Sequence, residues 1–193
     1  MPITHKIERE RATILVWEIT ETLEGLIMLS GNINTSNHTS EKRKKEHLTS
    51  RLIVNEICPT KTIIYNEVGA PELDNGKYIS ISHSKELVAV IISDKKTGLD
   101  IELISEKSLR LASKFVSEKN LIQLNKEKAT LIWCIKEAIY KWHQKGGVDF
   151  IKDIIIPEFN AEEHGKVTVY FRKKELNLNY LKINNHYLVY VCN

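Results

Sequence analysis

Two long amphipathic helices, each set among short strand-like segments, constrain the fold of this chain more than any other feature. The first begins after Ser40, which can cap it, and ends before Pro59. The second covers residues 127–143 and stops before Gly146 and Gly147. Shorter helices are predicted at 20–30, 108–116 and 118–124, and strands at 12–19, 62–65, 78–82, 87–93, 98–103, 151–156, 166–171 and 186–191. The pattern predicts an α+β fold made of two similar halves, residues 1–96 and 97–193.

The composition excludes several classes of protein. The 193 residues are 42% hydrophobic and 27% charged, which argues against disorder. A formal net charge of +3 is too small for a dedicated nucleic-acid binder. No apolar run approaches the roughly 18 residues of a membrane span, and the first residues do not resemble a signal peptide. Cys58, Cys134 and Cys192 are odd in number and far apart, so we expect a reduced, cytoplasmic protein without membrane or nucleic-acid partners.

Residues 98–102 carry two acids at alternate positions of a predicted strand. Asp100 and Glu102 should face the same side, about 7 Å apart, while Leu99 and Ile101 face the core. Such a pair suits a hard cation such as Mg²⁺. Taken alone, the motif is so common that an ordinary strand face with two solvated acids is favoured. Alanine in place of Asp100, or of Glu137 in the helix described next, is expected to leave the fold intact, because exposed acids contribute little to stability.

Residues 133–141 place a carboxylate and an ammonium one helical turn apart. Glu137 and Lys141 share a face, with Trp133 one turn earlier, and could hold a metal and a phosphate together. The alternative is an ordinary ion pair worth a few tenths of a kcal/mol, with Trp133 in the core. Lys136 points about 100° away around the helix, which suggests a supporting or phosphate-side position.

Residues 80–84 read Ser-Ile-Ser-His-Ser at the end of a predicted strand. Hydroxyls, an imidazole and loop N–H groups at a strand end can cradle a phosphate. The alternative is a turn capped by its own side chains. A nucleophilic serine is disfavoured, because Ser82 and His83 are adjacent and no G-x-S-x-G motif surrounds them.

In the order ISISHS, GLDIE and WCIKEAIYK, these segments resemble the 4′-phosphopantetheinyl transferase superfamily. The resemblance is closer to its longer single-chain branch, which activates surfactin- and enterobactin-type synthetases. That branch carries N/S-x-SHS, then G-[IV]-D-[IV]-E, then W-x-x-KEA-x-x-K. Residues 43–52 are similar to its R-x-x-E-x-L-A-x-R helix, and residues 145–150 to its K-x-G-x-D-F segment. One departure is Gly69-Ala70-Pro71, where the branch has a Gly-Lys-Pro whose lysine contacts coenzyme A.

The resemblance implies Mg²⁺-dependent transfer of 4′-phosphopantetheine from coenzyme A to a serine of an acyl or peptidyl carrier protein. Adenosine 3′,5′-bisphosphate would be released, as by a holo-[acyl-carrier-protein] synthase. Mn²⁺ would also suit the site. The general base would be Glu137 or a metal-bound water. The implied metal ligands are Asp100, Glu102 and Glu137, the catalytic residues Glu137 and Lys141, and the coenzyme A contacts Arg43, Arg51, Ser82, His83 and Lys141.

The same resemblance implies a pseudo-dimer of two α+β halves, with the active site between them, in a chain that works as a monomer. The surface that meets the carrier protein would lie around residues 145–152. Two alternatives remain open. One is a different metal-dependent phosphotransferase. The other is a coenzyme A- or nucleotide-binding protein with weak or lost turnover, which the alanine at position 70 leaves open.

Overall fold

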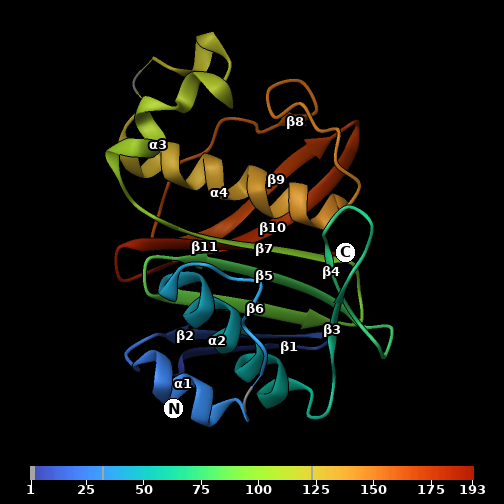
Figure 1. Cartoon of the computed structure of the whole chain (residues 1–193). Helices are drawn as coiled ribbons and strands as arrows, with labels where there is room; N and C mark the ends of the chain where they lie inside the picture. Colours follow the sequence, from blue (N-terminus) through green and yellow to red (C-terminus); the bar gives the residue numbers. More distant parts are fainter. Residues whose placement is uncertain (1–2, 32, 123) are drawn as a thin grey trace. The chain divides into compact units, whose positions relative to one another are not determined.

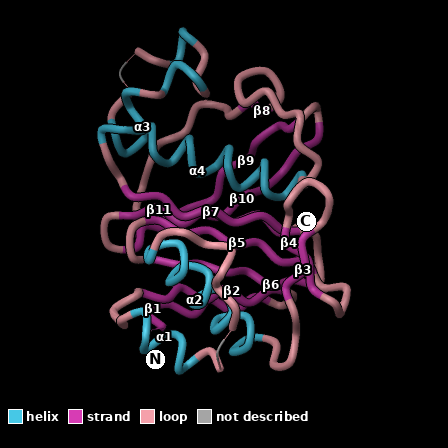
Figure 2. Tube along the Cα trace, viewed as in Figure 1, coloured by secondary structure: helices cyan, strands magenta, loops and turns pink. Residues whose placement is uncertain are grey.

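The computed structural model describes residues 3–31, 33–122 and 124–193, and the chain packs as two units, Met1–Lys95 and Lys96–Asn193. Each unit contains an antiparallel sheet and one long helix (Figures 1 and 2). The prediction of an α+β fold with two sheet-containing halves is confirmed. No helix of the described ranges is both long and apolar enough to cross a bilayer.

The first unit is built on a sheet with the strand order β1-β2-β6-β5-β4-β3. Ser40 caps α2 by accepting a hydrogen bond from the backbone nitrogen of Arg43, as predicted. The apolar face of α2 packs on the sheet through Ile53 and Val54, against Trp17 and Val90 among others. The elements are β1 (Ile3–Arg9), β2 (Ala12–Glu18), α1 (Leu23–Leu29), α2 (Glu41–Ile57), β3 (Ile63–Tyr65), β4 (Pro71–Leu73), β5 (Tyr78–Ser84) and β6 (Leu87–Ser93).

The second unit is built on a sheet with the order β7-β11-β10-β9-β8, and α4 lies across it (Figure 1). Leu131, Ile135 and Ile139 of α4 pack on Val189 and Val191 of the sheet. This core fixes the helix on which Glu137 and Lys141 lie. The elements are β7 (Thr97–Leu103), α3 (Glu106–Arg110), 3₁₀ turns at Ala112–Lys114 and Glu118–Asn120, α4 (Lys126–His143), β8 (Ile154–Ile155), β9 (His164–Phe171), β10 (Lys174–Ile183) and β11 (His186–Cys192).

The segment between β7 and α4 differs from the prediction of two short helices. It forms the five-residue helix α3 and two 3₁₀ turns instead. Serine and asparagine side chains recur through this stretch and compete with helical backbone bonds. Phe115 and Val116 nevertheless bury themselves against Ile132 of α4, so tertiary packing holds the irregular segment in place.

Three strands, β1, β4 and β10, lay outside the predicted set. The edge strand β1 carries several charged residues, and β10 contains asparagine and glutamate, which are poor strand formers. In β10 the apolar positions Leu176, Leu178 and Tyr180 alternate and are buried, so the period of two was present in the sequence. The predicted strand at 151–156 shrinks to Ile154–Ile155.

Candidate active site

Gly98 lets α4 lie directly on β7. A Cβ atom at this position would meet the carbonyl oxygen of Ala138 and would lie 2.5 Å from the backbone nitrogen of Trp142. Any side chain here would push the strand and the helix apart. Asp100 and Glu102 alternate with Gly98 along the strand, so their side chains face the same helix. The glycine of the motif therefore sets the distance at which the two acids meet α4.

Both strand acids are held by side chains of α4. Asp100 is 3% exposed, and Lys141 Nζ donates to its Oδ1 at 2.7 Å. Trp133 Nε1 donates to Glu102 Oε1 at 2.9 Å. The expectation of exposed acids is wrong for Asp100, because the helix covers it. Its replacement will therefore affect stability as well as any chemistry.

The three predicted metal ligands influence one another electrostatically. Burial raises the pKa of Glu137 to about 7, the charge of Asp100 adds to the rise, and Lys141 opposes it. Burial and then the charge of Asp100 also raise the pKa of Glu102, against the hydrogen bond from Trp133. Three carboxyl groups thus share one nearby ammonium, and this excess of negative charge favours a cation.

Asp100, Glu102 and Glu137 fit a hard divalent cation by their chemistry, since all their donors are carboxylate oxygens. Within the described residues, however, no three His, Cys, Asp or Glu side chains are already grouped to hold an ion. One oxygen of each strand acid already accepts a hydrogen bond, Asp100 Oδ1 from Lys141 and Glu102 Oε1 from Trp133.

Trp133 has two roles, of which the sequence predicted one. Its ring packs on Phe115 and Phe150, with centroid separations of 5.0 and 5.6 Å, as expected of a core residue. Its indole nitrogen also orients Glu102, which the sequence analysis missed. The available indication was the spacing that places Trp133 one turn before Glu137 on the same helix face.

Lys136 does not point at a phosphate site. Its side chain is 5% exposed and donates to the carbonyl oxygens of Phe150 and Ile154, the latter at 2.8 Å. Burial lowers the pKa of Lys136 to about 8, and the charge of Asp149 opposes this shift. Lys136 therefore ties the segment that follows α4 back to the helix. Of the two positions predicted for it, these contacts favour the supporting one.

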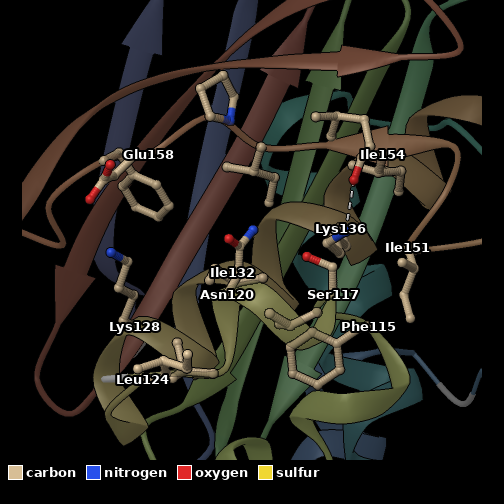
Figure 3. Close-up of a pocket in the computed structure, with 16 residues that line it drawn as sticks. Phe115, Ser117, Asn120, Leu124, Lys128, Ile132, Lys136, Ile151, Ile154 and Glu158 are labelled. Carbon is tan, nitrogen blue, oxygen red and sulfur yellow. Dashed lines mark hydrogen bonds between the residues drawn. The ribbon is translucent and has the colours of Figure 1, made fainter.

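A cavity of about 710 Å³ lies beside α4 in the second unit (Figure 3). Most of the residues that line it are apolar, and they come from residues 115–122, Leu124, α4 and residues 151–159. Figure 3 shows Lys128 and Lys136 entering it from the helix. The three acids do not line this cavity, so the acid site and the cavity are separate features of the unit.

Two of the predicted phosphate contacts meet in the first unit. Arg43 Nη1 lies 2.9 Å from His83 Nε2. Glu46, which the sequence analysis did not single out, lies between them. Its Oε2 is 3.3 Å from Arg43 Nη1, and its Oε1 is 3.3 Å from His83 Nδ1. The spacing of Glu46 three residues after Arg43 on a helix could have indicated this contact.

Arg51 is held at a different point of α2. Its Nη2 donates to the hydroxyl of Tyr65 and its Nη1 to Ser50 Oγ, both at 2.9 Å. Two helical turns separate it from Arg43, about 12 Å along the helix axis. The structure therefore does not join the two arginines in a single cluster.

The segment of residues 80–84 is strand, and the predicted cradle of loop N–H groups is wrong. β5 extends to Ser84 and stays paired with β6 as far as the Ser84–Leu87 pair. Ser82 is buried and alternates with His83, so the two side chains face opposite sides of the sheet. The sequence did not predict that the strand continues as far as Ser84, because Ser and His are weak strand formers.

These features define a two-unit α+β protein whose second unit carries a buried acidic site between a strand and its covering helix. Residues 96–192, about half of the chain, match the family model of the 4′-phosphopantetheinyl transferase superfamily, and the chain belongs to that superfamily. It is 36% identical over 97 residues to 4′-phosphopantetheinyl transferase gsp from Aneurinibacillus migulanus. The matched stretch covers 46% of this chain and 41% of the relative, so it spans less than half the relative's length. The resemblance found in the sequence is confirmed.

Proposed function

We propose that this chain transfers 4′-phosphopantetheine from coenzyme A to a serine of an acyl or peptidyl carrier protein, in the manner of a holo-[acyl-carrier-protein] synthase. The observation that carries the proposal is the convergence of Asp100, Glu102, Glu137 and Lys141 at the contact between β7 and α4. Family membership and the name of the relative support the same activity.

The proposed reaction places strong demands on charge. The serine oxygen of the carrier attacks the pyrophosphate phosphorus next to pantetheine, the bond to the departing adenosine 3′,5′-bisphosphate breaks, and the serine proton passes to a base. Lys141 offers an ammonium to the charge that develops on phosphate oxygens. Glu137, with a pKa raised to about 7, suits proton acceptance near neutral pH, and a water is the other candidate base. Mg²⁺ or Mn²⁺, held by Asp100, Glu102 and Glu137, would neutralise pyrophosphate charge.

For coenzyme A phosphates we propose Arg43 and His83, with Arg51 as a second contact beside Tyr65. The Arg43 and His83 side chains are 60% and 36% exposed, so both can reach a ligand. Arginine presents a fork of donors that matches phosphate. Ser82 is buried on the opposite face of its strand from His83, so its predicted phosphate contact is the least supported of the set. The location of the site between the two halves stays a prediction.

For the carrier protein we propose the segment after α4, residues 145–152. Lys145 and Lys152 are exposed there, which suits the acidic carrier that the family resemblance implies. Ile151 also lines the cavity beside α4, so charged and apolar contacts are available side by side. We further propose that the enzyme works as a monomer, because one chain carries the proposed residues for both substrates.

The test is incubation of the full chain with coenzyme A, Mg²⁺ and a panel of apo carrier proteins, read by intact mass. The expected result is a carrier that gains one phosphopantetheine. Glu137→Gln should abolish the gain. Glu127→Gln on the same helix should not, because that carboxylate pairs with Lys182 at the surface.

Each rival predicts a different result. A different metal-dependent phosphotransferase would leave every carrier unmodified and would bind no coenzyme A in calorimetry. A protein that has lost turnover would bind coenzyme A without modifying a carrier. Full activity of Glu137→Gln would remove the assignment of the acid site.

A further inference from the structure

Glu46 is a buried carboxylate that the proposed reaction does not use directly. It lies near the start of α2, is 4% exposed, and has three basic side chains around it. Arg43 and His83 approach it at 3.3 Å and Lys42 at 3.8 Å. Taking a carboxylate out of water costs several kcal/mol unless its surroundings compensate. The basic neighbours provide that compensation, so the four side chains must be considered together.

The contact between Arg43 and His83 determines where the imidazole proton lies. A guanidinium can only donate hydrogen bonds. Nε2 of His83, 2.9 Å from Arg43 Nη1, must therefore accept, and the proton of the neutral ring is on Nδ1. Nδ1 is the nitrogen nearer to Glu46, at 3.3 Å from Oε1, an electrostatic contact without hydrogen-bond geometry. A carboxylate at this position favours the Nδ1–H tautomer, because it attracts the N–H dipole.

The same carboxylate also orients the guanidinium. Glu46 Oε2 contacts Nη1 of Arg43, the atom that reaches His83. One buried acid thus contacts both Arg43 and His83, while a large part of each of these two side chains remains exposed to solvent. With Lys42 nearby, the group carries more positive than negative charge, which suits an anionic ligand.

We infer that Glu46 is a positioning residue: it holds His83 as the Nδ1–H tautomer and orients the guanidinium of Arg43. The two side chains are then oriented in advance to bind one phosphate of coenzyme A. The inference rests on the proposed function, because it takes Arg43 and His83 as phosphate contacts. Glu46 itself touches no ligand. Its effect is on binding and not on the transfer step.

The test compares two isosteric variants on the same helix. Glu46→Gln removes the buried charge but keeps the size of the side chain. Glu41→Gln is the control, since the Glu41 carboxylate is exposed and pairs with Lys45 at 3.3 Å. Two readouts are taken on the full chain: the ring ¹⁵N NMR shifts of His83, assigned with His83→Gln, and the KM for coenzyme A against kcat.

In Glu46→Gln we expect the His83 shifts to move away from the Nδ1–H pattern. We also expect the KM for coenzyme A to rise about tenfold, as for the loss of one charge-assisted contact, with kcat changed less than about twofold. Glu41→Gln should change neither. Unchanged His83 shifts, an unchanged KM, or a loss confined to kcat would each overturn the inference.

The outcome separates this inference from the proposed function. If the wild type transfers nothing but binds coenzyme A, and Glu46→Gln binds it more weakly with altered His83 shifts, the inference stands and the transferase proposal falls. If Glu46→Gln does not fold, the same readouts apply to Glu46→Asp, which keeps the charge but withdraws the oxygens by one methylene. A wild-type KM and wild-type shifts in Glu46→Asp would then overturn the inference.

Discussion

Replacing Lys136 with methionine removes a buried ammonium but keeps a side chain of similar length. The carbonyl oxygens of Phe150 and Ile154 lose their donor. Two unpaired carbonyls cost about 1–3 kcal/mol each, so about 4 kcal/mol together. Against this, the pKa of Lys136 near 8 instead of 10.5 means that burying its charge already costs about 3 kcal/mol, which methionine recovers. The expected net loss in the free energy of unfolding is about 1 kcal/mol.

Urea unfolding of Lys136→Met at pH 7 measures this difference, with Lys128→Met as the matched control. Lys128 lies on the same helix and borders the same cavity, but its ammonium is 5.5 Å from the ring centroid of Phe159. Loss of that contact should cost about 0.5 kcal/mol or less. If Lys136→Met is more stable than the wild type, the two carbonyl contacts do not compensate the buried charge, and the reasoning fails.

The local effect of Lys136→Met should exceed the global one. Asp149 organises the following turn by accepting from the backbone nitrogens of Ile151 and Lys152, and Lys136 ties this turn to α4. We expect faster amide hydrogen exchange at residues 151–154 in the variant. Because this turn belongs to the proposed carrier surface, the KM for the carrier should rise while that for coenzyme A stays unchanged. Equal exchange in variant and wild type would show that Lys136 does not hold the turn.

Gly98→Ala should lower the free energy of unfolding by about 3 kcal/mol, because the added Cβ atom meets the backbone of α4. Gly25→Ala, whose added Cβ has its nearest neighbour at 3.4 Å, should change the free energy of unfolding by less than about 1 kcal/mol. Urea unfolding of both variants measures the difference. Burial, then the charges of Arg51 and His38, lowers the pKa of His47 to about 4, below its ordinary 6.5. The contribution of the neutral His47 to the free energy of unfolding should therefore be fully present above pH 6.5 and be lost between pH 6.5 and 4. The loss should be about 1 kcal/mol after solvent screening. Unfolding of His47→Gln, measured at several pH values in this range, should show a smaller dependence on pH. Ala70→Lys should lower the KM for coenzyme A severalfold in steady-state kinetics, because it restores the lysine that the family resemblance places there; an unchanged KM would show that position 70 does not meet the ligand.

The main features of the second unit were predictable because they follow from local periodicity. The helix from Lys126 to His143 shows its apolar face in the sequence, and the strand from Thr97 to Leu103 alternates. Gly98 was part of the motif, but the reason for it became clear only from the helix that crosses the strand there. A close backbone approach involves residues about 40 positions apart, and no local pattern reveals it.

Contacts between distant residues account for what the sequence analysis missed. The bond from Trp133 to Glu102 and the approach of Glu46 to His83 both join a helix to a strand of the sheet. Each depends on the register in which the helix lies on the strand, which tertiary packing decides. The extension of β5 through Ser84 was missed for a related reason, since pairing with β6 overrides the weak strand propensity of its residues.

A buried acid with basic side chains beside it recurs in each unit: Asp100 of β7 with Lys141 of α4, and Glu46 of α2 with Arg43 of the same helix and His83 of β5. Removing Lys141 leaves the buried Asp100 carboxylate and its two acidic neighbours without an ammonium, at a cost of about 3 kcal/mol or more. Loss of activity in Lys141→Met would therefore mix unfolding with lost chemistry. The double variant Asp100→Asn with Lys141→Met removes both charges and should unfold closer to the wild type than Lys141→Met alone, yet remain inactive in the mass assay. Recovery of stability together with activity would show that this pair serves the fold and not the transfer.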